Sequence, residues 1–469
     1  MLSADLLARY QEKEPVPLMA WALINHAISP EFLDDLFART ALKQYDKTLL
    51  FSNVTTLMSA IATGVHRSVG AALQSKLHPI GVSDQAFYSK LNGLEPALCE
   101  ALVRESGERL SKVIGALGGT PTPPVPGYRT LILDGNAIGA TDHRIDELRD
   151  IGSAALPGKS LVILDAQKSI ASEVIACEDG HAQERSMSDE LLKRVRVGDL
   201  FIADRNFCTT KLLCGIHERG AAFLIREHKA LPWTSLGPPM PQGVNENGSF
   251  WEHRIRIDAE NGSSVIARRI ILELPENEKT RDGDQKLVII TTLPPECADA
   301  AHVAELYRTR WTIETLFQTL TTTLRCEIHT LGYPRAALFV FAVALVAANI
   351  IAALRAAIRS VHGGQAEALL STYYIVASIQ AGCSTFFNGF GTEIVAPYQR
   401  MSRAELVLFL QACARHINLA RYKKAPTKPK RPRKARPPAP PDEPHVSTAR
   451  ILAGKKKKKS RKNGSLNSP

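Results

Sequence analysis

The sequence predicts a mixed α/β fold, and three observations predict it. Apolar residues recur at helical spacing through residues 1–120. Short, β-rich apolar runs separated by turn residues begin at residue 128 and then alternate with helical stretches, an order typical of a mixed sheet covered by helices. Hydrophobic residues make up 45% of the chain and charged residues 22%, a composition that excludes wholesale disorder. A length of 469 residues predicts more than one domain.

Residues 1–120 are predicted to form a helical DNA-binding domain. Within it, residues 82–91 resemble the second helix of a helix-turn-helix, with Ser83 as its cap and with Gln85, Tyr88 and Ser89 as the side chains that would meet DNA. An ordinary capped surface helix has the same pattern, so the sequence leaves open which helix contacts DNA.

A proline-rich segment, residues 121–127, predicts a boundary before a second domain over residues 128–420. Five runs in this second domain are predicted strands: 130–138, 160–167, 172–178, 199–204 and 221–227. Helices are expected between the later strands, at 183–195 and 209–220. A β-rich insertion is expected at about 230–295, followed by one long amphipathic helix over 298–332.

Residues 336–354 are apolar at every position except Asn349, which meets the length rule for a membrane span. About half of this run is alanine, and no second candidate span occurs in the sequence. These two facts favour a buried core helix, and no membrane partner is expected.

The last segment, residues 421–469, is rich in proline and lysine and is predicted to be a disordered basic tail. It holds 17 Lys and Arg residues and two Asp and Glu residues, while the other 420 residues hold 41 and 45. The formal net charge of +11 is therefore a property of the tail, which would bind nucleic-acid phosphates without sequence preference. None of the eight cysteines belongs to a Cys-x-x-Cys pair. Residues 1–15 lack the basic segment followed by an apolar segment that is typical of a secretory signal. We therefore expect a protein of a reducing cytoplasm.

Two aspartates each follow an apolar strand. Asp134 ends the run 131–133, and Asp204 ends the run 200–203. Such positions place carboxylates at the rim of a sheet, where ligands bind in α/β folds. A single aspartate of this kind is more often a turn or helix cap, and Asp165, which ends another run, has the same pattern.

A third acid, Glu314, follows Tyr307 and Arg310 by seven and four residues, a spacing that places all three on one helix face. The competing interpretation is an ordinary Arg–Glu pair on a solvated face. Three carboxylates suit two Mg²⁺ ions about 3.5–4 Å apart, which can clamp the attacking and leaving oxygens of a phosphodiester. A nearby Arg and Tyr would bind a DNA phosphate.

These motifs resemble the DDE transposases of bacterial insertion sequences: Asp-Gly-Asn at 134, Ala-Asp-Arg-Asn-Phe at 203, and Tyr-x₂-Arg-x₃-Glu at 307. The resemblance is to the insertion-sequence-4 group, whose signature is Tyr-x₂-Arg-x₃-Glu-x₆-Lys. It implies an RNase H-like catalytic core in which Asp134, Asp204 and Glu314 are catalytic and hold two Mg²⁺ ions, with Mn²⁺ able to substitute. It also implies DNA contacts from Tyr307 and Arg310.

The signature lysine falls at Thr321, so the sequence departs from the group there. Arg325 is the predicted substitute for DNA binding, with Arg308 as a second candidate. The family also stacks a tryptophan of the insertion on a flipped base. Trp233 and Trp251 are present in the insertion, but core packing is the expectation for each.

The predicted function is a transposase that catalyses metal-dependent DNA cleavage and strand transfer at insertion-sequence ends. The expected partners are double-stranded DNA at the element ends and the target, and a second copy of the chain in a synaptic complex. The expected location is the bacterial cytoplasm, at the nucleoid. Two alternatives stay open: a non-catalytic DNA-binding protein derived from a transposase, and an RNase H-fold nuclease without strand transfer.

Overall fold

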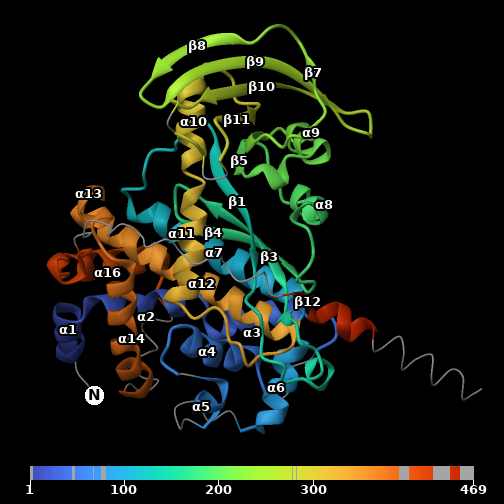
Figure 1. Ribbon diagram of the computed structural model, residues 1–469. Coiled ribbons are helices and arrows are strands. Elements are labelled where there is room, and N and C mark those ends of the chain that lie inside the picture. The colour runs from blue at the N-terminus through green and yellow to red at the C-terminus, as the bar shows by residue number, and fades with distance from the viewer. Residues whose placement is uncertain are drawn as a thin grey trace, which may run out of the picture.

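The computed structural model describes residues 4–44, 48–66, 68–74, 81–276, 278–280, 283–389, 401–425 and 444–454. Figure 1 shows most helices gathered at one end of the molecule and the strands rising from them to the other end. A mixed α/β architecture, as predicted, is therefore confirmed.

The amino-terminal region is helical, as predicted. Its helices are α1 (Ala4–Lys13), α2 (Pro15–Ala27), α3 (Pro30–Thr40), α4 (Phe51–Ala62), α5 (Val69–Leu73), α6 (Asp84–Gly93) and α7 (Pro96–Leu117). Ser83 caps α6 by accepting a hydrogen bond from the amide of Ala86, and Phe87 and Leu91 bury one side of this helix. Gln85 and Ser89 lie on its exposed side.

Five strands build the central sheet: β1 (Arg129–Ala137), β3 (Lys159–Asp165), β4 (Ile170–Cys177), β5 (Asp199–Ala203) and β6 (Ala222–Arg226). Their order is β4-β3-β1-β5-β6. Strands β1, β5 and β6 are parallel, whereas β3 is antiparallel to both of its neighbours. This order and these directions are those of an RNase H-like core, so both the predicted fold class and the five predicted strands are confirmed.

The β-rich insertion continues the same sheet. Its strands are β7 (Thr234–Ser235), β8 (Met240–Asn245), β9 (Gly248–Asp258), β10 (Ser264–Glu273) and β11 (Lys286–Thr291). Strand β11 pairs antiparallel with β6, and β10 and β9 follow outward. The insertion therefore extends the central sheet at its β6 edge, where Figure 1 shows it as the upper layer.

Alternate residues of the central strands face two different cores. Leu131, Leu133 and Phe201 pack in one core with α8 (Ser188–Leu192) and α9 (Thr210–Glu218). Ile132 and Ile202 pack in the other core, together with α12 (Pro334–His362) and the amino-terminal helices. Two short helices lie on the first face, η2 (Glu184–Met187) and η3 (Arg205–Phe207), while η1 (Asp146–Leu148) packs in a separate small cluster with Ala155.

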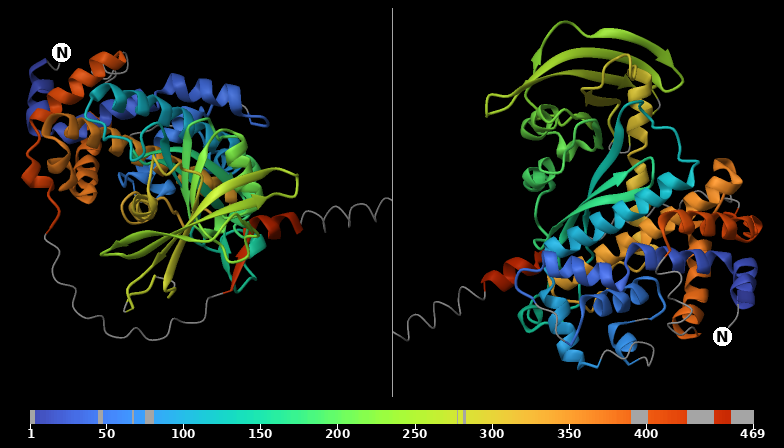
Figure 2. Two further views of the ribbon diagram at one scale, coloured as in Figure 1. Left: turned by 90° about the horizontal axis from the view of Figure 1, so that it is seen from above. Right: turned by 180° about the vertical axis from the view of Figure 1, so that it is seen from behind.

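Helix α12 is a core helix, as predicted. It is long and apolar enough to cross a membrane by length and composition, but its most apolar 18-residue stretch is entirely buried inside the molecule. It packs against α7, and both lie against the sheet (Figure 2, right). Asn349, the one polar residue of its apolar stretch 336–354, bonds both the amide and the carbonyl of Ala171 in β4.

The expected boundary at 121–127 does not separate two cores. Helices α2–α7 belong to the same continuous apolar cluster as α12 and one face of the sheet. Val125, inside the proline-rich segment, is itself fully buried. The physical reason is that α7 packs directly on β4 and α12 and so joins the helical region to the sheet.

The prediction of one helix over 298–332 is wrong. The chain forms α10 (Ala300–Arg308) and α11 (Trp311–Thr322), and the helix breaks at Thr309 and Arg310. The amides of these two residues bond the carbonyls three positions back, at Leu306 and Tyr307, which tightens the last turn of α10 and ends it.

The carboxyl-terminal region contains α13 (Gly364–Ala368), α14 (Thr372–Gly389), α16 (Arg403–Arg415), η4 (Leu419–Tyr422) and β12 (His445–Ser447). The predicted disorder of 421–469 is wrong for residues 444–454. Here β12 pairs in parallel with β2 (Ala154–Leu156), and residues 448–454 are helical. Val446, Ile451 and Leu452 pack against Ile145 and Leu148, so a short apolar segment hidden in a basic sequence folds back onto the domain.

Candidate active site

Asp134 and Asp204 lie side by side where the pairing of β1 with β5 ends. The last pair in this parallel pairing is Leu133 with Ala203; Asp134 is the next residue of β1, and Asp204 directly follows β5. Asp134 Oδ1 accepts a hydrogen bond from the amide of Gly135, and Asp204 Oδ1 accepts one from the amide of Asn206, both at 2.9 Å. The strand ends thus place two carboxylates together, as the sequence predicts.

Asp165 shares the sequence pattern but lies at the opposite edge. Because β3 runs antiparallel to β1, Asp165 pairs with Leu131 near the beginning of β1. Its carboxylate accepts a hydrogen bond from the amide of Lys168 and closes a turn. Strand direction therefore separates this aspartate from the other two.

Arg310 joins Glu314 to the aspartates. Its Nη2 donates to Glu314 Oε1 at 2.6 Å, and its Nη1 donates to Asp134 Oδ2 at 3.1 Å. The side chain of Arg310 is only 12% exposed. The Arg310–Glu314 pair is thus not an ordinary pair on a solvated face, because it is packed against a strand aspartate.

The break between α10 and α11 places Arg310 at the start of α11, while Ile313 and Leu320 bury one side of that helix in the core. Tyr307 lies at the end of α10 and is buried. Burial raises the pKa of Tyr307, the positive charge of Arg310 opposes this effect, and the charge of Asp204 adds to it. Tyr307 therefore lies within electrostatic range of the same group of residues.

The two aspartates carry an excess of negative charge in a buried setting. Burial raises the pKa of Asp134 to about 7; Arg310 counteracts this shift, and the charge of Asp204 adds to it. Burial is also the largest cause of the raised pKa of Asp204, and the nearby Glu184 charge adds to it. One buried arginine thus does not fully compensate the carboxylates.

Glu184 is a fourth acid at this edge, which the sequence analysis missed. Its Oε1 lies 3.2 Å from Lys159 Nζ, and its Oε2 accepts a hydrogen bond of 3.4 Å from the side-chain amide of Asn206. A Cβ atom on Gly135 would lie 2.3 Å from Glu184 Oε1. The glycine of the Asp-Gly-Asn motif is the signal that could have pointed to a close neighbour, because any Cβ here would require the Glu184 side chain to move.

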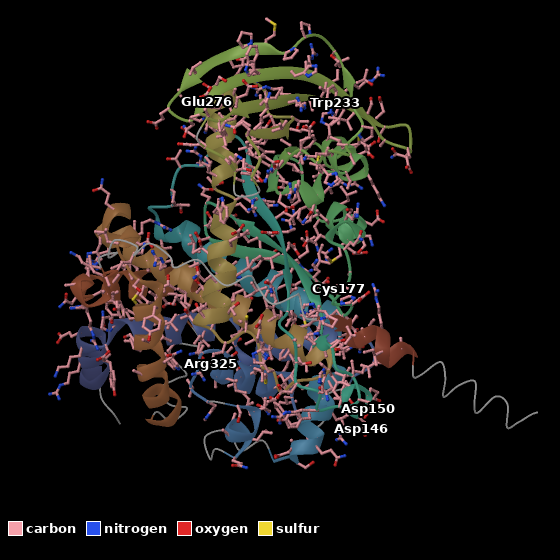
Figure 3. All side chains as sticks on the ribbon, viewed as in Figure 1. Asp146, Asp150, Cys177, Trp233, Glu276 and Arg325 are labelled. Atoms are coloured by element: carbon pink, nitrogen blue, oxygen red, sulfur yellow. The ribbon has the colours of Figure 1, made fainter. Side chains whose placement is uncertain are left out.

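Arg325 does not join this group. It follows the end of α11, has a φ of 42°, and its guanidinium carbon lies 3.8 Å from the position that a Cβ on Gly64 would occupy, at the turn after α4. Figure 3 shows it among the lower helices. The expectation that Arg325 continues the helix face of Glu314 fails, because α11 ends at Thr322.

Thr321 lies at the position of the signature lysine. It is exposed, and its hydroxyl donates a hydrogen bond to the carbonyl of Phe317.

Trp233 is not a core residue, contrary to the expectation. Its side chain is 37% exposed in the upper part of the sheet (Figure 3), its Nε1 donates to Glu227 Oε1 at 3.1 Å, and the Arg269 guanidinium lies over its ring. Trp251 lies in β9 and is half-buried.

Arg308 is the second candidate for DNA binding. Its guanidinium donates a hydrogen bond to the side-chain oxygen of Asn247.

The donor set suits a divalent cation in part. Asp134 and Asp204 offer carboxylate oxygens where the pairing of β1 with β5 ends, and a bound cation would favour their charged form, which burial disfavours. Arg310 bonds one oxygen each of Asp134 and Glu314. Within the described part of the chain, no group of three or more His, Cys, Asp or Glu residues is close enough to hold a metal ion. Arg310 would therefore have to release Asp134 and Glu314 before these acids could share a cation with Asp204.

One family model matches the part of the chain that contains this arrangement. Residues 126–350 match the family model described as "Transposase DDE domain", and this range contains Asp134, Asp204 and Glu314. Among curated protein sequences, none matches significantly. A solved cryo-EM structure of a piggyBac transposase synaptic complex with hairpin DNA is similar at a TM-score of 0.38 and 12% identity, over 84% of this chain and 86% of that chain. Residues 126–350 of this chain are therefore similar to a transposase DDE domain.

Proposed function

We propose that this chain is a DNA transposase that cuts a strand at the end of a mobile element and joins the released 3′-hydroxyl to target DNA. Asp134, Asp204 and Glu314 would be its catalytic carboxylates. The observation that carries this proposal is the grouping of these three acids around Arg310 inside the DDE-domain match. Double-stranded DNA would be the substrate at both steps.

Asp134 and Asp204 would hold divalent metal ions, two Mg²⁺ per site, with Glu314 as the third ligand and Mn²⁺ able to substitute. When bound, Mg²⁺ would supply positive charge that acidifies the attacking hydroxyl and stabilises the oxygens of the phosphodiester in the transition state. The limited exposure of the Asp134 and Arg310 side chains, 16% and 12%, excludes most water from these groups and strengthens their electrostatic effect.

Arg310 would change partners when DNA binds. In the structure its guanidinium pairs with both Glu314 and Asp134. The planar guanidinium also binds phosphate oxygens through two parallel hydrogen bonds, so a DNA phosphate would compete for the same donors and release Glu314. The Tyr307 hydroxyl, close in the same buried region, would donate a hydrogen bond to that phosphate.

The test is strand cleavage by an Asp204→Asn variant. Any inverted repeats that flank the gene supply the end-bearing duplex, and nicking is followed with Mg²⁺ in gels that resolve single strands. We expect Asp204→Asn to lower nicking at least 10³-fold with DNA affinity unchanged, because the carboxylate charge and not the shape of the side chain is lost.

Asp165→Asn is the matched control, because Asp165 ends a strand in the same way at the opposite edge of the sheet. Its nicking should equal that of the parent chain. Nicking that survives Asp204→Asn would remove the assignment of the triad. Nicking without joining would indicate a nuclease, and DNA binding without nicking in the parent chain would indicate a non-catalytic protein.

Four finer features belong to the same proposal. The Tyr-Arg-Glu spacing supports membership of the insertion-sequence-4 group, although Thr321 departs from its signature. A homodimer in the synaptic complex, no membrane partner and a nucleoid location in a bacterial cytoplasm would follow from that membership. The mass of the DNA complex in solution tests the dimer directly.

A further inference from the structure

Strand direction gathers basic side chains at the same sheet edge as Asp134 and Asp204. Lys159 begins the antiparallel strand β3 opposite Ala137, the last residue of β1. Arg205 follows Asp204 directly, and Arg226 ends β6, the next parallel strand. Lys286 begins the antiparallel strand β11, which pairs with β6 at Arg226. Four strands thus contribute a cation to one edge.

Two neighbouring pockets open along this edge. The first, of about 250 Å³, is lined by Lys159, Arg185, Arg205 and His228, with hydrogen-bonding groups from Asn206 and Thr209. The second, of about 560 Å³, shares Arg205 and His228 with the first and adds Arg226, Lys229 and Lys286. We call these two pockets the basic groove.

The groove concentrates positive charge on a body that is otherwise slightly acidic. Its lining contains six Lys and Arg residues against three acids, Glu184, Glu227 and Asp284. Residues 1–420 as a whole hold more Asp and Glu than Lys and Arg, 45 against 41. A local excess of cations in a cleft attracts a polyanion to that cleft.

The lining also indicates what kind of polyanion fits. It contains cations, side-chain amides and a hydroxyl, which are the usual donors to phosphate oxygens. It contains no Trp, Tyr or Phe on which a base would stack. Recognition of a sugar–phosphate backbone is therefore favoured over recognition of bases or of a free nucleotide.

We infer that the basic groove binds consecutive backbone phosphates of the DNA strand that enters the site at Asp134 and Asp204. The inference rests on the proposed function for the identity of that strand. Lys159 joins the groove to the candidate site, because its ammonium group contacts Glu184, which in turn lies against Gly135, the residue after Asp134. Arg205 lies in both pockets and would contact the phosphate between them.

The experiment measures DNA affinity of the full chain against salt, with Ca²⁺ in place of Mg²⁺ so that no strand is cut. The probes are an end-bearing duplex and an unrelated duplex. Log affinity falls linearly with log salt concentration, and each lost phosphate contact makes this fall less steep by about 0.9. We expect Lys159→Met and Arg205→Gln each to lower this slope by about one and the affinity severalfold on both probes, and the double variant to lower it by about two. A loss confined to the end-bearing probe would assign the groove to the element end alone.

Two variants control for charge and folding. Lys159→Arg keeps the cation and should keep the slope. Lys211→Met removes an exposed lysine of α9 that pairs with Asp189 outside the groove, and should change nothing. A slope and affinity unchanged in the double variant would overturn the inference, and so would an equal loss in Lys211→Met.

A second measurement separates the groove from the basic tail. An oligonucleotide carrying 4-thiothymidine is crosslinked to the full chain, and the attached peptides are identified by mass spectrometry. We expect crosslinks in peptides between residues 159 and 229 that disappear in the double variant; crosslinks found only in residues 421–469 would overturn the inference. Because neither readout requires cleavage, a chain that fails to nick DNA would refute the proposed function and leave the groove to be judged by binding.

Discussion

At the scale of single residues, the candidate active site is a balance of four acids and two cations. Arg310 bonds Asp134 and Glu314, while Lys159 pairs with Glu184. Removing the charge of a buried arginine or lysine here would leave an uncompensated carboxylate, which is costly in a buried setting. The acids proposed as catalytic therefore also lower the stability of the folded chain.

A prediction at this scale concerns pH. The pKa of Asp134 is raised from 3.8 to about 7 by burial, so the folded state holds a proton that the unfolded state has lost. The contribution of Asp134 to the free energy of unfolding should therefore be greatest below pH 4. It should fall as the pH rises from 4 to 7. The shift corresponds to about 1–4 kcal/mol.

Asp134→Asn should remove this dependence and be more stable than the parent chain at pH 8. The measurement is urea unfolding at pH 5 and pH 8 without divalent metal, with Asp165→Asn as the control. Parallel stability curves for Asp134→Asn and the parent chain would contradict the raised pKa. Added Mg²⁺ should reduce the difference, because a ligand that binds only the folded state stabilises it.

At the scale of elements, two polar contacts join the helices to the sheet. Asn349 accepts from the Ala171 amide at 2.8 Å and donates to the Ala171 carbonyl at 2.9 Å, so α12 is tied to β4 at one point. Arg268 in β10 bonds Glu252 in β9 and the carbonyls of Leu293 and Ala298, and so ties the insertion to the segment before α10. The first contact ties α12 to β4, and the second ties the insertion to the residues that precede α10, the helix that carries Tyr307.

Asn349→Leu should therefore destabilise the chain by about 2–4 kcal/mol, because it buries an amide and a carbonyl of Ala171 without partners. Chemical denaturation measures the change. Ser106→Ala is the control, since the buried Ser106 hydroxyl bonds only to carbonyls of its own helix, at Leu102 and Val103, and joins no second element. Equal losses for the two variants would show that the link between α12 and β4 has no special weight.

At the scale of the whole molecule, the carboxyl-terminal segment returns to the domain near the candidate site. Residues 444–454 pair with β2, bury Ser447 and Thr448, and place Arg450 at 2.8 Å from Asp179. Arg450 and Lys159 line one further pocket that adjoins the basic groove. The lysine run 455–459 follows Gly454 directly in the sequence.

Ile451→Asp should detach this segment, because a charged side chain replaces an apolar contact with the cluster at Ile145 and Leu148. We expect faster hydrogen exchange at the amides of residues 154–156 and 445–447 and earlier proteolysis before residue 444. Arg450→Ala should change little, since its side chain is 61% exposed and surface ion pairs contribute about 0–1 kcal/mol. Unchanged exchange in Ile451→Asp would contradict the packing.

The sequence by itself determined the class of fold, the five central strands and the aspartates that follow two of their apolar runs, because short apolar runs and the residues after them are local properties. It also determined that α12 is a core helix. The tertiary structure decided which acids meet. Asp134 and Asp165 end similar runs, yet opposite strand directions place them at opposite edges of the sheet.

Only the fold brought Glu184 onto Gly135, placed Arg310 between Asp134 and Glu314, and turned Arg325 away after the end of α11. Each of these depends on contacts between residues far apart in the chain, or on where a helix stops. Both are set by packing of the whole molecule, which local sequence patterns do not encode.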